Sequence, residues 1–349
     1  MKKISIVGTA GIPACYGGFE TLVENLTAYS SGTIKYNVFC SGKTYEKKIG
    51  EYNGAELTYI DLNANGIQSI PYDILSLLQS RKSDVILILG ISGCIALPLI
   101  RLISNAKIIT NIDGLEWKRN KWNYAIKKFL KFSEWLAVKF SNVVIADNQE
   151  ITKYVKENYG IEAVTIAYGG DHVLQGTVDV SADDYYLSLC RIEPENNVEL
   201  ILETFSKSGN KLKFVGNWKS SEFGKKMIKK YCEFSNIEMI APIYNIDQLF
   251  ELRSKCKAYV HGHSAGGTNP SLVEIMHFAK PVLAFDCAFN RYTTDNTALY
   301  FRNELDLSEI LNNEQMLSEQ LQNCALSMKA IACSRYTWKT IAESYEALY

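Results

Sequence analysis

The sequence predicts an α/β protein built from two similar domains, each with a parallel sheet. Short apolar runs with strand character alternate with longer amphipathic stretches, which is the rhythm of β-α-β units. This alternation stops in a polar stretch after Gly169 and Gly170 and then restarts. The chain has 349 residues, too many for one ordinary hydrophobic core. We therefore expect two sheets, each binding ligands at the carboxyl ends of its strands.

Strands are expected where a short apolar run is bounded by glycine or polar residues. In the first domain these runs are 4–7, 35–40, 57–60, 85–89, 107–110, 143–146 and 164–167; in the second they are 185–189, 211–215, 237–240, 258–260 and 281–285. The limits that follow are a first domain of residues 1–170, a linker of 171–184 and a second domain of 185–333. An aromatic amphipathic helix over 334–349 is expected to pack on one of the domains.

One uncharged run, residues 85–100, approaches the length of a membrane span. Gly90, Gly93 and Pro98 interrupt it. A buried strand that turns at the glycines into a short helix is the better interpretation.

The composition excludes several classes of function. The net charge is −1 and 47% of the residues are hydrophobic, which argues against a nucleic-acid partner. The nine cysteines lie singly, as in proteins whose thiols stay reduced. The apolar run after Lys2 and Lys3 ends at Gly8 and is too short for a secretory signal. A cytoplasmic location is therefore expected.

The loop after strand 258–260 is the strongest candidate for a binding site. Asn269 is placed to cap the helix that follows, and Pro270 to begin it. The backbone N–H groups of this turn, with those of Gly266, Gly267 and Thr268, are then open to an anion such as phosphate.

Two other interpretations of this loop stay open. Ser271 and Glu274 have the spacing of a capping box, in which the carboxylate only satisfies a backbone N–H. His261 and His263 flank a glycine, but no cluster of Cys or Asp accompanies them, so no metal site is expected.

Two further loops of the second domain follow predicted strands and are expected at the same edge of its sheet. Arg191 follows the first of these strands, where a guanidinium can bind a diphosphate with two parallel hydrogen bonds. The alternative is a weak surface ion pair with Glu193 or Glu195. Gly216 and Asn217 follow the next strand, where they and the adjacent Trp218 are candidates to contact a base or a sugar.

The first domain offers a glycine-bearing loop and two acidic side chains. Gly17 and Gly18 lie close to a helix start with Glu20, but the spacing from Gly8 is not that of a dinucleotide-binding fingerprint. The loop therefore fits either the floor of a cleft or a plain turn. Asp113 and Glu116 follow the strand 107–110 and are candidates for acid/base chemistry.

A basic and aromatic segment follows Glu116, and Glu134 is the only acid between Lys118 and Lys139. This composition is typical of a helix at an anionic membrane surface, although a solvated basic helix is the plainer alternative. Nucleic acid is a weaker option, because the rest of the chain is not basic. The residues proposed for contact with the acceptor or the membrane are Glu20, Trp117, Lys118, Arg119, Lys121, Trp122, Lys127 and Lys128.

Four motifs together resemble the bacterial rhamnosyltransferases of glycosyltransferase family 4. They are Gly11-Ile12-Pro13 with Tyr16-Gly17-Gly18-Phe19-Glu20, the stretch 113–119, the stretch 191–197 and the stretch 261–274. The resemblance spans nearly the whole chain. It implies a GT-B fold, in which two Rossmann-like lobes enclose the active site in the cleft between them. It also implies a transfer that needs no metal or cofactor and that retains the anomeric configuration of the sugar. The implied donor is a nucleotide sugar, with dTDP-L-rhamnose as the first choice.

The same resemblance implies a lipid-diphosphate-linked saccharide as acceptor, in the synthesis of capsule or cell-wall polysaccharide. The enzyme would then attach peripherally to the inner face of the plasma membrane, on an anionic surface. The rivals are a nucleotide-sugar epimerase of the same fold and a sugar-nucleotide-binding protein without catalysis.

Roles of single residues follow from the resemblance in the same way. Arg191 would hold the diphosphate, the 266–268 amides would cradle phosphate or sugar, and Glu274 would reach the sugar of the nucleotide. Asn196 stands where the family often has a lysine, and Gly266 where it commonly has a second acid. The expected catalytic residues are Asp113, Glu116, Arg191 and Glu274. The expected donor-binding residues are Gly17, Gly18, Arg191, Asn196, Gly216, Asn217, His263, Gly266, Gly267, Thr268, Asn269, Ser271, Leu272 and Glu274.

Overall fold

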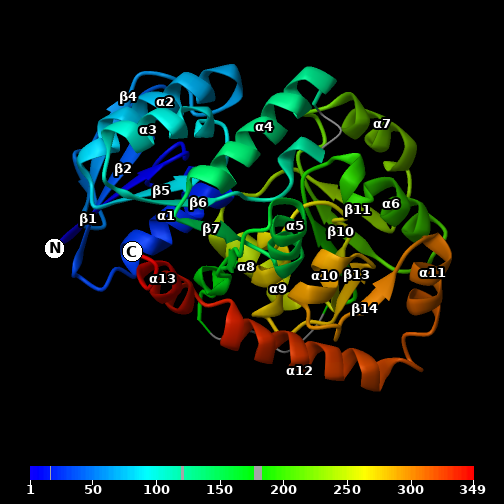
Figure 1. The fold of residues 1–349 in the computed structure, drawn as a ribbon. Helices are drawn as coiled ribbons and strands as arrows, with labels where there is room; N and C mark the ends of the chain where they lie inside the picture. Colours follow the sequence, from blue (N-terminus) through cyan, green and yellow to red (C-terminus); the bar gives the residue numbers. More distant parts are fainter. Residues whose placement is uncertain (16, 119–121, 177–182) are drawn as a thin grey trace. The chain divides into compact units, whose positions relative to one another are not determined.

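The computed structural model describes residues 1–15, 17–118, 122–176 and 183–349. The chain divides into two compact units, which are considered separately (Figure 1). Unit 1 contains Met1–Tyr168 and Trp338–Tyr349, and unit 2 contains Gly169–Thr337. The stretch expected as a linker, 171–184, falls in unit 2, and its residues 177–182 lie outside the described part of the chain.

Unit 1 is built on an eight-stranded sheet in the order β3-β4-β2-β1-β5-β6-β7-β8. All neighbouring strands run parallel except β3, which pairs antiparallel with β4. The strands are β1 (Lys2–Val7), β2 (Ile34–Ser41), β3 (Glu51–Tyr52), β4 (Ala55–Ile60), β5 (Val85–Leu89), β6 (Lys107–Asn111), β7 (Val143–Ala146) and β8 (Val164–Thr165). Strand β5 is buried along its whole length, as is typical of a central parallel strand.

Helices cover both faces of this sheet (Figure 1). Helices α2 (Ser69–Gln79), α3 (Leu97–Ile103) and α4 (Tyr124–Phe140) lie on one face, and α1 (Gly18–Ala28) lies on the other beside α13 (Trp338–Glu346). Helix α5 is Gln149–Tyr159, and the 3-10 turns are η1 (Gly66–Gln68), η2 (Ser80–Lys82), η3 (Cys94–Ala96) and η4 (Glu116–Lys118). The run 85–100 thus forms the expected buried strand and the start of a short helix.

Unit 2 is built on a six-stranded parallel sheet in the order β11-β10-β9-β12-β13-β14. The strands are β9 (Tyr186–Leu189), β10 (Leu212–Val215), β11 (Ile237–Ile240), β12 (Ala258–His261), β13 (Val282–Phe285) and β14 (Leu299–Phe301). The helices are α6 (Val198–Ser206), α7 (Glu222–Tyr231), α8 (Ile246–Lys255), α9 (Pro270–Met276), α10 (Ala288–Thr293), α11 (Glu304–Asn312) and α12 (Ser318–Arg335), with turns η5 (Asp171–Val173) and η6 (Pro194–Asn196).

The order of strands reverses once in each sheet. In unit 2 the chain passes outward through β9, β10 and β11, then returns to β12 on the other side of β9. In unit 1 the same reversal lies between β1 and β5. Such switch points open a crevice at the carboxyl ends of the strands, and this is where open α/β sheets bind their ligands.

The C-terminal helix differs in detail from the expected one. Residues 334 and 335 finish α12, and α13 begins only at Trp338 and packs on α1 of unit 1. The phenol oxygen of Tyr345 accepts a hydrogen bond from Nδ2 of Asn111 at 2.8 Å, and both residues are buried. The ring of Tyr349 packs edge-on against Tyr36, with ring centroids 6.1 Å apart.

The hydrogen bond between Tyr345 and Asn111 predicts that removing the Tyr345 hydroxyl lowers the stability of the protein. Tyr345→Phe leaves a buried amide without its acceptor, so the free energy of unfolding is expected to fall by about 1–3 kcal/mol. Urea denaturation measures the change, with Tyr29→Phe at an exposed position as the control. Equal stability of the two variants would contradict a structural role for this bond.

Candidate functional site

Two loops meet at the switch point of unit 2. The first, residues 190–197, follows β9, and the second, residues 262–269, follows β12, the strand beside β9. The amide and the hydroxyl of Ser264 both donate to the carbonyl oxygen of Glu195, at 3.0 and 2.7 Å. The side chain of Asn197 donates to the carbonyl oxygen of Gly262 at 2.8 Å. The two loops are therefore held together as one surface.

A buried pair, Asn196 and His263, lies beneath this surface. Nδ2 of Asn196 donates to the carbonyl oxygen of Arg191 at 2.7 Å, which orients the amide. Its Oδ1 lies 2.7 Å from Nδ1 of His263 and must accept, so Nδ1 carries a proton. Asn196 thus fixes both the tautomer of the histidine and the path of the chain at Arg191.

Gly262 allows the backbones of the two loops to approach this closely. A Cβ atom at this position would overlap the carbonyl oxygen of Asn196 and lie 2.8 Å from Cδ1 of Ile201. No other residue type fits between them without moving one loop.

The turn before α9 presents backbone N–H groups. Oδ1 of Asn269 accepts from the amide of Ser271 at 3.0 Å, which confirms Asn269 as the N-cap, and the amide of Leu272 donates to the carbonyl oxygen of Asn269. The amides of 265–267, in contrast, find no acceptor among the described residues. Gly266 has φ +119°, a conformation that favours glycine. Successive amides of this kind make a concave site for an anion.

Arg191 lies in the loop after β9, and β9 pairs with β12, so this cation and the amides belong to the same edge of the sheet. Its side chain is 52% exposed, and Nε lies 4.0 Å from Oε2 of Glu193, at the limit of an ion pair. Such a contact is weak in water, so the guanidinium keeps its capacity to bind a diphosphate.

Glu274 does not act as the acid of a capping box. Its carboxylate binds the guanidinium of Arg253 on α8, and Oε1 lies 3.7 Å from Nε2 of His172. The side chain of Arg253 is 6% exposed, so removal of Glu274 leaves a nearly buried charge without its partner, a loss that is strongly destabilising. Glu274→Ala is therefore expected to destabilise unit 2.

The loop after β10 serves packing more than ligand contact. Trp218 is buried, and its Nε1 donates to the carbonyl oxygen of Ile240 at 3.0 Å, so the indole is not free to contact a base or a sugar as expected from the sequence. A Cβ atom on Gly216 would overlap Ile192 and lie 2.8 Å from the carbonyl oxygen of Cys190. Asn217 is exposed, whereas the side chain of Leu272 is fully buried.

His261 and His263 do not form a metal centre with the described residues. Their ring centroids lie 6.0 Å apart, and no group of three His, Cys, Asp or Glu side chains within the described ranges is placed to hold a metal ion. Nε2 of His261 is buried without a hydrogen-bond partner in that part of the chain. Burial, reinforced by the charge of His263, holds the pKa of His261 well below its usual value.

The switch point of unit 1 is also built around a glycine and a buried acid. A Cβ atom on Gly8 would overlap the carbonyl oxygen of Leu89 at the end of β5. Oε1 of Glu20 accepts from the amide of Ala10 at 2.7 Å and from the hydroxyl of Thr9 at 3.0 Å. Glu20 was expected from the sequence to contact the saccharide acceptor or the membrane. In the structure its carboxylate instead stabilises the loop after β1.

Gly17 and Gly18 lie at the start of α1. Gly17 is the N-cap residue, with φ +142°, and a Cβ atom there would meet the carboxylate of Glu20. A Cβ atom on Gly18 would lie 3.1 Å from the hydroxyl of Tyr168.

Asp113 and Glu116 follow β6 as expected. The amide of Asp113 donates to Oδ1 of Asn111 at 2.9 Å, and its φ of +60° is a left-handed conformation that Asp tolerates. Strained positions of this kind cluster at functional sites. Oε1 of Glu116 accepts from Nε1 of Trp122 at 3.1 Å.

Sequence reasoning missed Asp73, which lies on α2 at the same edge of the sheet. Ser92, in the loop after β5, donates to its carboxylate, and a Cβ atom on the adjacent Gly93 would overlap the Cβ atom of Asp73. Burial raises the pKa of Asp73 to about 7, although the hydrogen bond from Ser92 acts to lower it. An Asp inside an amphipathic helix gives no signal in the sequence, because only tertiary packing buries it.

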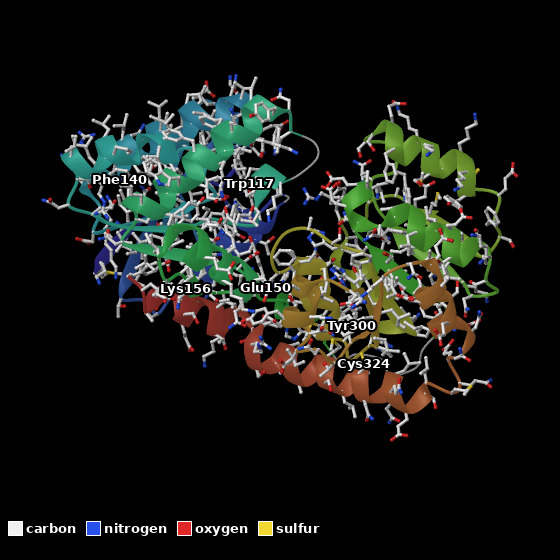
Figure 2. All side chains as sticks on the ribbon, turned by 45° about the vertical axis from the view of Figure 1, so that its right-hand side comes forward. Trp117, Phe140, Glu150, Lys156, Tyr300 and Cys324 are labelled. Atoms are coloured by element: carbon white, nitrogen blue, oxygen red, sulfur yellow. The ribbon has the colours of Figure 1, made fainter. Side chains whose placement is uncertain are left out.

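Trp117 and Trp122, which were expected to contact a membrane, instead donate hydrogen bonds to carboxylates of unit 1. Nε1 of Trp117 donates to Oε2 of Glu134 at 2.9 Å, beside the ammonium of Lys131, which lies 4.5 Å from the indole centroid. Figure 2 labels Trp117, on the turn η4 before α4, and Phe140, the last residue of α4. Lys118 and Lys128 are exposed, Lys127 is partly buried, and Arg119 and Lys121 lie outside the described residues. Within the described ranges no helix has the length and apolarity needed to cross a bilayer.

Gly262 gives a test of the loop contact. Gly262→Ala is expected to lower the free energy of unfolding by about 1–3 kcal/mol, because the new methyl group overlaps backbone. Gly209→Ala, at a position with nothing within 4 Å, is the matched control. Urea denaturation compares the two, and equal stability would show that the loops are not in close contact.

Asp73 gives a test by pH. Its pKa rises from about 3.9 unfolded to about 7 folded, so its contribution to stability is present below pH 4 and lost as pH rises through 7. Asp73→Asn is uncharged throughout, so its stability relative to wild type is expected to rise between pH 4 and pH 8 by on the order of 4 kcal/mol. Denaturation at several pH values measures this, and exposed Asp61→Asn is the control. A difference that does not vary with pH would contradict the burial of Asp73.

Comparison with known proteins agrees with this geometry. Residues 178–302 match the family model "Glycosyl transferases group 1", and residues 1–171 match the "Domain of unknown function (DUF1972)". No curated protein matches the sequence significantly.

Solved structures match the chain over its whole length. Sucrose-phosphate synthase from Thermosynechococcus elongatus has a TM-score of 0.83 at 13% identity, covering 100% of this chain and 98% of that one. HepE from Anabaena, in complex with UDP-glucose, has a TM-score of 0.74 at 15% identity, covering 100% and 99%. A glycosyltransferase from Rickettsia africae has a TM-score of 0.73 at 14% identity, covering 100% and 97%.

The expected fold class is confirmed, an α/β GT-B fold with two Rossmann-like sheets. Residues 178–302 are thus similar to the group 1 glycosyltransferases, and residues 1–171 are similar to the DUF1972 domain.

Proposed function

We propose that this protein transfers L-rhamnose, with retention, from dTDP-L-rhamnose to a lipid-linked saccharide in the synthesis of capsule or cell-wall polysaccharide. The observation that carries the proposal is the row of amides at 265–267, which find no acceptor among the described residues and lie at the sheet edge that also bears Arg191. It lies within the part of the chain that matches the glycosyltransferase family. A guanidinium and a concave row of N–H groups suit a diphosphate.

The donor class is supported by the structural relatives. The HepE structures are described as complexes with UDP, with UDP and glucose, and with UDP-glucose. A dTDP-sugar presents the same diphosphate and a closely similar pyrimidine base. Glu274, oriented by Arg253, is the proposed contact to the sugar of the nucleotide.

The proposed reaction breaks the bond between the anomeric carbon of the donor and the diphosphate oxygen, and it forms a bond from the acceptor hydroxyl oxygen to that carbon. The electron pair stays with the diphosphate, which takes the proton of the acceptor. Arg191 and the amides stabilise the negative charge that grows on the leaving group. Asp113 and Glu116 are the proposed groups near the reacting sugar and the acceptor.

The proposed site of action is the cytoplasmic face of the plasma membrane, with the protein attached peripherally. A lipid-linked acceptor keeps its saccharide at the bilayer surface. An enzyme bound to the same surface therefore meets its acceptor by diffusion in the plane of the membrane. The basic segment around α4 supports this location.

A donor panel tests the function. The protein is incubated with labelled dTDP-rhamnose, UDP-glucose and other nucleotide sugars in the presence of a membrane extract. Label in the lipid fraction from dTDP-rhamnose is the expected result. An isomerised donor would replace the proposal with an epimerase, and binding without turnover would replace it with a sensor.

Arg191→Ala is expected to lower kcat/KM for the donor about 100-fold to 1000-fold, since it removes one charged group aimed at the leaving group. Arg302→Ala, which removes an arginine whose side chain is 73% exposed, is the control and should keep wild-type activity. Initial rates at varied donor concentration measure both. Wild-type kinetics in Arg191→Ala would remove this residue from the mechanism.

A further inference from the structure

Two neighbouring helices of unit 1 leave large apolar side chains in solvent. Helix α4 contacts both α3 and the turn η3 before it. The exposed apolar residues on these elements, here called the α3–α4 face, are Ile95, Leu99, Leu102, Ile103, Tyr124, Phe132 and Trp135. Leu102 is 83% exposed and Phe132 is 50% exposed. Monomeric proteins rarely leave neighbouring apolar groups of this size uncovered unless they bind something.

The face is basic as well as apolar. Tyr124, Lys128, Phe132, Trp135 and Lys139 follow one another at helical spacing along a single stripe of α4. The ammonium of Lys128 lies 4.6 Å from the ring centroid of Tyr124, and that of Lys139 lies 4.8 Å from Trp135. The rings of Phe132 and Trp135 stack at 5.8 Å.

Acidic charge is absent from the surface of the two helices. Helix α3 contains no Asp or Glu. The one acid of α4, Glu134, is 1% exposed, and it accepts hydrogen bonds from Lys131, Trp117 and the hydroxyls of Tyr154 and Tyr159. Because this carboxylate is buried, the only charged side chains on the outer side of α4 are cations.

We propose that the α3–α4 face docks on an anionic phospholipid surface. Leu102, Phe132 and Trp135 enter the boundary between headgroups and acyl chains, while Lys128 and Lys139 stay at the level of the phosphates. The inference deepens the proposed function, because it assigns the surface by which the enzyme reaches a lipid-linked acceptor. Lipid binding itself depends only on this face.

A second copy of the chain is the alternative occupant. A two-fold interface would place the same basic stripe on both sides, so its lysines would face one another without acids between them. An anionic bilayer meets the same stripe with the opposite charge. The charge pattern therefore favours lipid.

Vesicle binding tests the proposal with the full chain. Co-sedimentation is measured with vesicles of phosphatidylcholine alone and with vesicles that also contain phosphatidylglycerol. Wild type is expected to bind the anionic vesicles and to lose that binding as salt is raised. Leu102→Gln with Phe132→Gln should weaken binding at least tenfold, which corresponds to losing two buried apolar groups. Lys128→Gln with Lys139→Gln should weaken it about fivefold per lysine.

The matched control is Leu305→Gln with Leu326→Gln, which removes two exposed apolar side chains from unit 2 and should bind as wild type does. Wild-type binding by the Leu102/Phe132 variant, or equal binding of wild type to neutral and anionic vesicles, would overturn the proposal. So would sedimentation showing a wild-type dimer that this variant converts to a monomer.

Transfer to a short water-soluble acceptor separates this inference from the proposed function. The Leu102/Phe132 variant should keep that transfer while it loses transfer to acceptor held in vesicles. Vesicle binding by a wild type that transfers no sugar would refute the proposed function and leave the docking surface standing.

Discussion

Close approach of two backbones at the switch point of each sheet is the constraint on which the rest of the structure depends. In unit 2, Gly262 lies against the carbonyl of Asn196, and in unit 1, Gly8 lies against the carbonyl of Leu89. In unit 2 this proximity lets Asn196 bind both the Arg191 carbonyl and His263. The position of the backbone at Arg191 thus depends on Gly262, a residue that has no side chain.

The distribution of charge follows from the same packing. Glu20, Glu134 and Glu274 are largely withdrawn from solvent, and each is matched by hydrogen-bond donors or a cation inside its own unit. Among the described residues, exposed Lys128 and Lys139 form no ion pair, and exposed Arg191 has only the weak contact with Glu193 at 4.0 Å. A protein with a net charge of −1 can in this way present locally cationic surfaces to anionic ligands.

Short apolar runs bounded by glycine or polar residues were sufficient to predict most strands and the loops at their ends. Strand β14 (Leu299–Phe301) and the hairpin strand β3 escaped notice, because two or three residues carry no alternation. The N-cap at Asn269 was predictable because capping is local chemistry. Contacts between distant residues were not: nothing in the spacing pairs Glu274 with Arg253, buries Asp73, or turns Trp117 toward Glu134. The sequence did not show which apolar residues of α3 are exposed: packing buries Leu97 and Ile100 and leaves Leu99, Leu102 and Ile103 on the surface.

The path of the chain gives the last twelve residues an effect on the first unit. The chain leaves unit 1 after Tyr168 and rejoins it at Trp338, and Tyr345 and Ile341 are buried there. During synthesis, therefore, the N-terminal sheet emerges from the ribosome without the helix that covers part of it, and it waits for the whole of unit 2 to be translated. A premature stop codon after residue 337 would remove nothing from unit 2, yet it would leave unit 1 with an uncovered apolar face, which is a target for proteolysis.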